Sequence, residues 1–224
     1  GITTALKLTL ADPAWVRRNL SITGTRLQKE LQSTICSPVN DASPRKQSIR
    51  TARSFGSEVQ SLHALNESVG TFAANCASKL RKEESCCISI TTFVMTNPFK
   101  PQAPQYNASR TIKLEVPTND TLEIVASAIQ ALKFIYRDGF SYKKAGVLVS
   151  SITPSAEVQL GLFDVVDRSK RTSLMTSIDT INMKLGHDKV RLAVQGFDRK
   201  WRLRQERLSP CYTTRFTDFL TVKV

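Results

Sequence analysis

The sequence predicts an α+β fold in which two helices cover one face of a four-stranded sheet. Four strand-like stretches alternate with two helix-like stretches in the order β-α-β-β-α-β. The expected elements are residues 48–55, 57–84, 87–94, 110–116, 120–138 and 142–152. This order defines the split βαβ, or ferredoxin-like, unit, whose helices both pack on the same face of the sheet.

The first 36 residues are expected to form a helical hairpin. Asp12 precedes Pro13, and the pair suits a helix start because aspartate caps backbone N–H groups and proline is tolerated at the first helical position. A break at Thr23-Gly24 is expected to separate a second apolar helix. Residues 37–47 contain two prolines among small polar residues and are expected to be a linker.

The first strand is expected to end at Gly56, where the chain turns into a helix. Ser57 and Gln60 have the spacing of a capping box, in which each side chain bonds the other's backbone N–H. Apolar residues then recur on one helical face, which we expect to pack on the sheet. They are Val59, Leu62, Val69, Phe72, Cys76 and Leu80.

The second half of the block repeats the pattern after a proline-rich loop at residues 97–105. The third strand alternates cleanly, with Ile112 and Leu114 facing one way and Thr111 and Lys113 the other. Asp120 is expected to cap the next helix, which Gly139 ends. Residues 48–155 are therefore the expected domain. Its second sheet face, rich in Thr, Ser, Lys and Arg, is either a docking surface or an ordinary solvated face.

Residues 171–224 are expected to form a basic C-terminal extension. A helix is expected at 172–185, ended by Gly186, and a short strand at 189–194. Residues 199–204 interleave four basic residues with Trp201. That mixture suits phosphate contacts and stacking on single-stranded nucleic acid, and it equally suits a basic strand edge.

The charge is strongly positive and uneven. The chain carries 32 Lys and Arg against 19 Asp and Glu, a formal net charge of +13. Residues 1–47 carry a net +4, residues 48–164 a net +2 and residues 165–224 a net +7. Basic ends around a balanced middle favour a polyanionic partner, most economically nucleic acid. A generically basic soluble protein is the alternative.

The cysteines and histidines argue against a metal site. The five cysteines contain no C-x-x-C pair, and neither histidine has ligand-like neighbours. Reduced thiols in a cytosolic protein are therefore expected. No apolar run is long enough to span a membrane, so we expect no membrane partner.

Gln159-Leu160-Gly161-Leu162-Phe163-Asp164 has the pattern of a short peptide ligand. Leu162 and Phe163 can enter one apolar pocket while the amide of Gln159 bonds at its rim. Pro154 and Ser155 precede the hexapeptide and a charged run follows it, which favours an exposed linker at residues 156–170. The alternative is a hydrophobic strand end packed on the core.

Several of these stretches together resemble the C-terminal half of a Y-family translesion DNA polymerase of the UmuC type. Residues 1–18 are similar to the family's thumb helices, and Arg53-Ser54-Phe55-Gly56 to the start of its little-finger domain. Residues 159–164 match its motif for the sliding clamp, with Gly161 where Asn or Ser is usual. Residues 204–210 and 212–215 are similar to the C-terminal extension of this subfamily.

The resemblance implies a division of labour along the chain. Residues 1–36 would be a thumb remnant, 48–155 the DNA-binding little finger, and 159–163 the clamp tether through Gln159, Leu160, Leu162 and Phe163. The expected DNA contacts are Arg50, Arg53, Ser54, Thr111, Lys113 and Lys143 on the sheet and Arg17 and Arg18 on the thumb helix.

The resemblance also implies partners and a location. The partners would be damaged or primer-template DNA, the sliding clamp, a UmuD-type accessory subunit and a recombinase filament. The location would be the bacterial cytoplasm, associated with the nucleoid, in the SOS response.

No catalytic residue is expected in this chain, because the family's Mg²⁺-binding carboxylates lie in a palm that precedes the thumb. Residues 177–180, Ser-Ile-Asp-Thr, echo a palm motif but lack its second carboxylate, and we interpret them as coincidence. A free-standing clamp-binding adaptor or inhibitor is the alternative function. An RNA-binding domain is a third, which predicts aromatic residues on the central strands, where only Phe93 is available.

Overall fold

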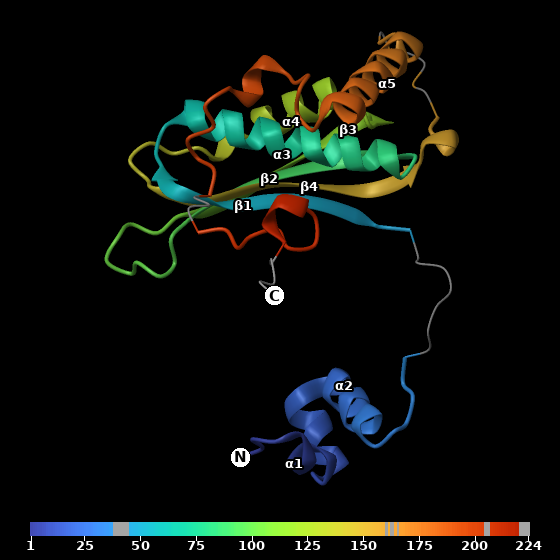
Figure 1. The fold of residues 1–224 in the computed structure, drawn as a ribbon, viewed down its shortest axis with the longest axis vertical. Coiled ribbons are helices and arrows are strands. Elements are labelled where there is room, and N and C mark those ends of the chain that lie inside the picture. The colour runs from blue at the N-terminus through green and yellow to red at the C-terminus, as the bar shows by residue number, and fades with distance from the viewer. Residues whose placement is uncertain (38–44, 160, 162–163, 165, 204–206, 220–224) are drawn as a thin grey trace, which may run out of the picture. The chain divides into compact units, whose positions relative to one another are not determined.

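A computed structural model describes residues 1–37, 45–159, 161, 164, 166–203 and 207–219 (Figure 1). The chain divides into two compact units, Gly1–Arg45 and Lys46–Val224.

In the first unit a short helix, α1 (Ala5–Thr9), packs against α2 (Pro13–Leu31). Asp12 caps α2 as predicted, since its carboxylate accepts hydrogen bonds from the backbone N–H groups of the first turn at 3.1 and 3.3 Å. The buried amide of Gln28 donates to the carbonyl oxygens of Leu8 and Ala11 and so ties α2 to the end of α1.

The interruption of α2 lies at Ser21, so the predicted break at Thr23-Gly24 is wrong. Ser21 has φ 62° and ψ −168°, outside the helical region, and helical geometry resumes after it. Gly24 has a packing role instead, because a Cβ there would lie 2.3 Å from the Cβ of Leu20.

The second unit contains the predicted sheet, and the α+β, ferredoxin-like fold class is confirmed. The strands lie in the order β1-β4-β2-β3, and every neighbouring pair is antiparallel. Both connecting helices pack against this one sheet on the same side (Figure 1). The elements are β1 (Ser48–Val59), α3 (Leu62–Lys82), β2 (Ser85–Thr96), β3 (Asn107–Thr118), α4 (Thr121–Ile135) and β4 (Tyr142–Pro154).

The core lies between these helices and the sheet. Most of the predicted apolar face of α3 is fully buried there, including Phe72, Cys76 and Leu80. Ile124 and Leu132 of α4 join it. Burying one such aliphatic or aromatic side chain contributes about 1.5–3 kcal/mol, so this layer holds the helices on the sheet.

The turn from β1 into α3 lies later than predicted. β1 continues to Val59, which pairs with Tyr142 of β4, and the cap of α3 is Ser61, whose hydroxyl accepts from the N–H of Ala64. The capping box expected at Ser57 is therefore wrong. The strand continues because Val59 is buried on the same side as Phe55 and gains a ladder partner on β4.

The C-terminal extension also departs from the prediction. The helix α5 (Arg168–Leu185) begins four residues earlier than expected, capped by Asp167, and ends at Gly186 as predicted. The expected strand at 189–194 is wrong. The chain there forms a short 3₁₀ helix, η2 (Ala193–Gln195), and Val194 packs closely over Gly70 of α3. Two further 3₁₀ turns are η1 (Ser155–Glu157) and η3 (Phe216–Asp218).

Trp201 is a core residue, so the suggested stacking of nucleic-acid bases on its ring is wrong. Its side chain is buried and makes edge contacts with Phe72 and Phe55, with ring centroids 5.4 and 6.3 Å apart. The N–H of Gly56 donates to the carbonyl oxygen of Trp201 at 3.3 Å. Residues of the C-terminal extension thus complete the core beside β1 and α3.

Candidate nucleic-acid interface

The strand register determines which side chains occupy the sheet face that α3 and α4 leave uncovered. Residues directly opposite in an antiparallel pair share a face, and successive residues alternate. Four cross-strand rows of four residues result, and we term these sixteen positions the helix-free face. They are Ser48, Arg50, Ala52 and Ser54 on β1; Lys144, Gly146, Leu148 and Ser150 on β4; Ser89, Thr91, Phe93 and Met95 on β2; and Asn107, Ser109, Thr111 and Lys113 on β3.

The helix-free face carries positive charge and hydroxyl groups but no carboxylate. Its cations are Arg50 on β1, Lys144 on β4 and Lys113 on β3, and none of the sixteen positions is Asp or Glu. Neighbouring strands lie about 4.8 Å apart, so the cations are spread across roughly 14 Å of sheet. A surface of this kind matches a row of phosphates better than it matches one compact anion.

Two local contacts order the middle of this face. The guanidinium carbon of Arg50 lies 4.4 Å from the centre of the Phe93 ring, and the hydroxyls of Thr91 and Thr111 are 2.7 Å apart. Gly146 lets the ring lie flat, because a Cβ there would be 2.5 Å from it. The arginine is thus held by a cation–π contact while its N–H groups can still donate outward.

The predicted sheet contacts are only partly on this face. Arg50, Ser54, Thr111 and Lys113 lie on it, but Arg53 does not. Arg53 lies on the same side of β1 as the buried Ile49 and Phe55, because an even number of positions separates it from each of them. It lines a cavity on the helix-covered side. Its expected place on the uncovered face is wrong, and strict alternation along β1 was the signal that excluded it.

Lys143 is also misplaced in the prediction, and its neighbour Lys144 was missed. The Nζ of Lys143 donates to the carbonyl oxygen of Phe55 at 2.6 Å, so it ties β4 to β1. The register shifts by one residue between Tyr142 and Lys144, which turns Lys144 to the helix-free face. Such a bulge depends on the pairing with β2, and no local sequence signal marks it.

The two remaining predicted contacts, Arg17 and Arg18, lie on α2 in the first unit and are exposed.

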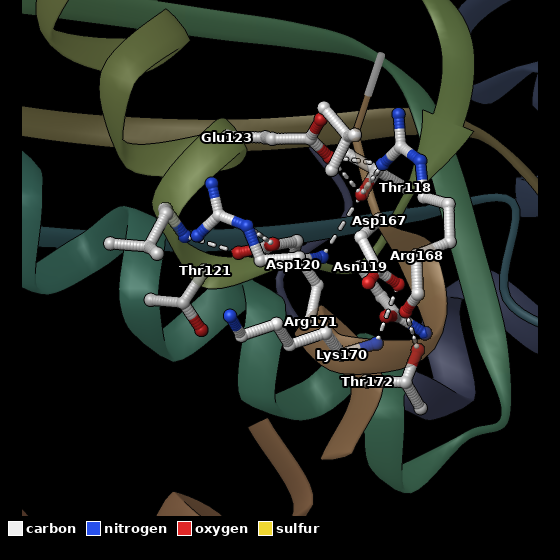
Figure 2. Close-up of polar contacts among 12 residues, drawn as sticks. Thr118, Asn119, Asp120, Thr121, Glu123, Asp167, Arg168, Lys170, Arg171 and Thr172 are labelled. Carbon is white, nitrogen blue, oxygen red and sulfur yellow. Dashed lines mark hydrogen bonds and ion pairs between the residues drawn. The ribbon is translucent and has the colours of Figure 1, made fainter. Parts of the chain in front are cut away.

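Of the predicted clamp motif, Gln159 is exposed, whereas Leu160, Leu162 and Phe163 lie outside the described residues. The linker predicted for residues 156–170 overlaps α5 at its end, because that helix begins at Arg168. Arg168, the first residue of α5, donates from Nε to Asp164 at 2.7 Å and from Nη1 to Glu123 of α4 at 2.6 Å (Figure 2). One guanidinium therefore joins the flank of the motif to the start of α4.

Two further ion pairs hold α5 against the helices of the sheet domain. Arg171 lies 3.5 Å from the carboxylate of Asp120, the cap of α4 (Figure 2). Arg81 of α3 forms a two-pronged pair with Asp179 at 2.6 and 2.8 Å. Asp179, from the segment that echoes a palm motif, therefore has a structural partner, in line with the interpretation as coincidence.

Arg168 and Asp164 hold each other in their ionised forms. The hydrogen bond from Arg168 lowers the pKa of Asp164 below its usual value. Burial alone would lower the pKa of Arg168, but its hydrogen bonds to Asp164 and Glu123 raise it overall. The sequence signal for this cluster was the charged run after the motif, which had been interpreted as a solvated linker.

The described residues contain no group of three or more His, Cys, Asp or Glu side chains placed to hold a metal ion. Their five cysteines are unpaired, and burial raises the pKa of Cys87 to about 12. Within the described part of the chain, no helix combines the length and the apolar character needed to cross a membrane.

The fold and the face define a ferredoxin-like domain with a basic sheet face that its two helices leave uncovered, extended by a C-terminal segment that completes its core. The impB/mucB/samB family C-terminal domain matches residues 46–162, and a domain of unknown function, DUF4113, matches residues 172–222. The chain belongs to the impB/mucB/samB family.

Individual relatives agree with this assignment. Protein ImpB of Salmonella typhimurium is 39% identical over 219 residues, which are 97% of this chain and 51% of that protein. Protein SamB of the same species is 40% identical over 225 residues, covering 100% of this chain and 53% of that protein. Protein UmuC of strain LT2 is 37% identical over 224 residues, with coverage of 100% and 53%. The chain spans about half the length of these relatives, and the predicted resemblance to the UmuC type is confirmed.

Proposed function

We propose that this chain is the DNA-binding and clamp-tethering part of a translesion DNA polymerase of the UmuC type, acting in DNA repair and damage-induced mutagenesis. Family membership supports the class of protein. The observation that carries the DNA-binding role is the helix-free face, with three cations and no carboxylate. Nucleotide transfer and its Mg²⁺ ions would belong to the palm of the whole protein.

In this proposal the helix-free face lies along the backbone of the primer-template duplex. Arg50, Lys113 and Lys144 pair with phosphates, and the threonine and serine hydroxyls donate to further phosphate oxygens. Phosphate contacts position a protein without reading base sequence. That property suits an enzyme that must copy damaged templates of any sequence.

The simultaneous replacement of Arg50, Lys113 and Lys144 by glutamine is expected to weaken binding to primer-template DNA. It should also make the affinity less dependent on salt concentration. If about five phosphates are neutralised by the parent, log affinity falls against log salt with a slope of roughly −4 to −5, and the triple variant should be shallower by about 2 to 3. Fluorescence anisotropy at several salt concentrations measures both slopes.

The matched control replaces Lys133, Lys170 and Lys184, three exposed cations on α4 and α5, with glutamine. It removes the same charge and should change the slope much less. Equal slopes for the two triple variants would mean that the helix-free face is not the contact. A strong preference for one DNA sequence in the parent would also contradict the proposal.

The clamp-tethering role is supported by the motif itself and by its surroundings. Gln159 and Gly161 are exposed, so the segment is accessible at these two positions. Asp164 holds the far end through Arg168. A tether fixed at its flank loses less freedom on binding than a free linker does, which favours affinity.

Replacing Leu162 and Phe163 with alanine is expected to abolish binding to the sliding clamp. Two apolar anchors contribute about 1.5–3 kcal/mol each, and a tether of this kind should bind with a dissociation constant around micromolar, or roughly −8 kcal/mol. Calorimetry with the clamp, beside a melting curve and DNA binding, tests this expectation.

The control for the clamp experiment replaces Tyr212 and Phe216, an exposed aromatic pair of the C-terminal extension, with alanine. It should keep clamp binding. Unfolding of the Leu162/Phe163 variant would mean that the hexapeptide belongs to the core. A folded variant with unchanged clamp affinity would place the contact on another surface.

The proposal also includes two partners that the resemblance implies for this chain, a UmuD-type accessory subunit and a recombinase filament.

A further inference from the structure

A cavity of about 550 Å³ lies between β1, α3 and residues 187–203 of the C-terminal extension. Its lining includes five side chains that carry a positive charge, together with His187 and a single carboxylate, that of Asp188. The five are Arg53, Lys79, Lys82, Arg199 and Arg202. A concave site with this balance of charge attracts an anion more strongly than an exposed patch does, because its walls keep solvent from screening the field.

Two residues that line the cavity, Arg199 and Trp201, also carry buried hydrogen-bond donors that are not used. The side chain of Arg199 is 2% exposed, and its Nη1 donates to Asp188 at 2.6 Å. Its Nε and Nη2, and the Nε1 of Trp201, have no acceptor among the described residues. Buried polar groups are nearly always paired, so three unpaired donor atoms on two neighbouring lining residues call for an acceptor.

The surroundings of Arg199 identify the kind of acceptor. The carboxylate of Asp188 is already ionised, and two arginines share it, since Arg202 lies 3.9 Å from it in addition to Arg199. A second acceptor must bring negative charge and several oxygen atoms to meet Lys79 and Lys82 as well. Phosphate has both properties, and arginine donors match its geometry. The volume exceeds that of one phosphate, which leaves room for the molecule that carries it.

We propose that this cavity is a binding site for a phosphate group, built by the C-terminal extension on the helix-covered side of β1. It is separate from the helix-free face, because Thr51 and Arg53, which line the cavity, alternate along β1 with Arg50, which does not. The extension thus has two roles: Trp201 completes the core, and Arg199 beside it recognises the ligand.

Fluorescence of Trp201 offers a direct test, since the chain has two tryptophans. In a Trp15→Phe background, titration with sodium phosphate at constant ionic strength, balanced with sodium chloride, should give a saturable change in emission. Replacing Lys79 and Lys82 with glutamine should weaken this binding about tenfold or more, because two charge-assisted contacts are lost. The matched control, Lys133→Gln with Lys184→Gln, should bind phosphate like the parent.

A second titration distinguishes the source of the phosphate. Competition of inorganic phosphate with a single-stranded oligonucleotide, lost in the Lys79/Lys82 variant, would identify a nucleic-acid backbone as the ligand. Phosphate binding without such competition would identify a small phosphorylated molecule. Absence of saturable phosphate binding, or equal weakening in the control variant, would overturn the proposal. The Arg50/Lys113/Lys144 variant should still bind phosphate, so this test and that of the helix-free face fail independently.

Discussion

Replacing Trp201 with alanine is expected to lower the free energy of unfolding of the second unit by about 3–5 kcal/mol, the range for truncating a buried aromatic residue. The indole is 5% exposed and contacts Phe72 and Phe55 edge to face. Its loss leaves a cavity between α3 and β1 that the rigid sheet cannot close. The effect should be large although Trp201 lies far along the chain from the sheet domain.

Urea denaturation followed by far-UV circular dichroism measures this change. Phe216→Ala is the control, because that ring belongs to the same extension but is 88% exposed, and it should cost less than about 0.5 kcal/mol. A Trp201→Ala protein as stable as the parent would show that the extension is an appendage rather than part of the core.

Replacing Asp188 with alanine is expected to cost about 3 kcal/mol or more, because it leaves the guanidinium of Arg199 buried without its partner. Adding Arg199→Met should restore much of that loss, since a buried ion pair can often be replaced by apolar residues of similar size. A double-mutant cycle from denaturant unfolding gives the coupling between the two positions. Additive losses would mean that the pair is not coupled.

The same pair predicts a dependence on pH. Burial alone would raise the pKa of Asp188, but the hydrogen bond and charge of Arg199 lower it overall. A carboxyl group whose pKa is lowered in the folded state stabilises the protein at pH values above its pKa in the unfolded state, about 3.9. This contribution is lost as the pH falls through the pKa of the folded state. Below about pH 4 the parent should therefore lose stability more steeply than Asp188→Ala. Parallel pH profiles for the two proteins would contradict this expectation.

Hydrophobic periodicity was sufficient to predict the sheet domain. The order of strands and helices, the cap at Asp120 and the buried face of α3 all follow from patterns that repeat within a few residues. Such patterns are reliable because burial of one face applies to every turn or every second residue of an element. The predicted clamp motif is likewise a local pattern, although three of its four predicted residues lie outside the described part of the chain.

The errors occurred where distant residues decide the outcome. Ser57 looked like a helix cap, but pairing of Val59 with Tyr142 extends the strand past it. Lys143 and Lys144 are indistinguishable in the sequence. The shifted register with β2 places Lys144 on the helix-free face and leaves Lys143 to bond the carbonyl oxygen of Phe55. Arg53 is different, because strict alternation along β1 already excluded it from the uncovered face.

By itself the sequence determined the class of fold, the family resemblance and a positive charge that favours a polyanion. The tertiary structure alone decided what the C-terminal extension does. Arg168 joins Asp164, beside the predicted clamp motif, to Glu123 of α4, and Trp201 and Arg199 enter the body of the domain. Charged and aromatic residues have no periodic signature, so whether they lie in solvent, core or cavity depends on the partners that the fold brings to them.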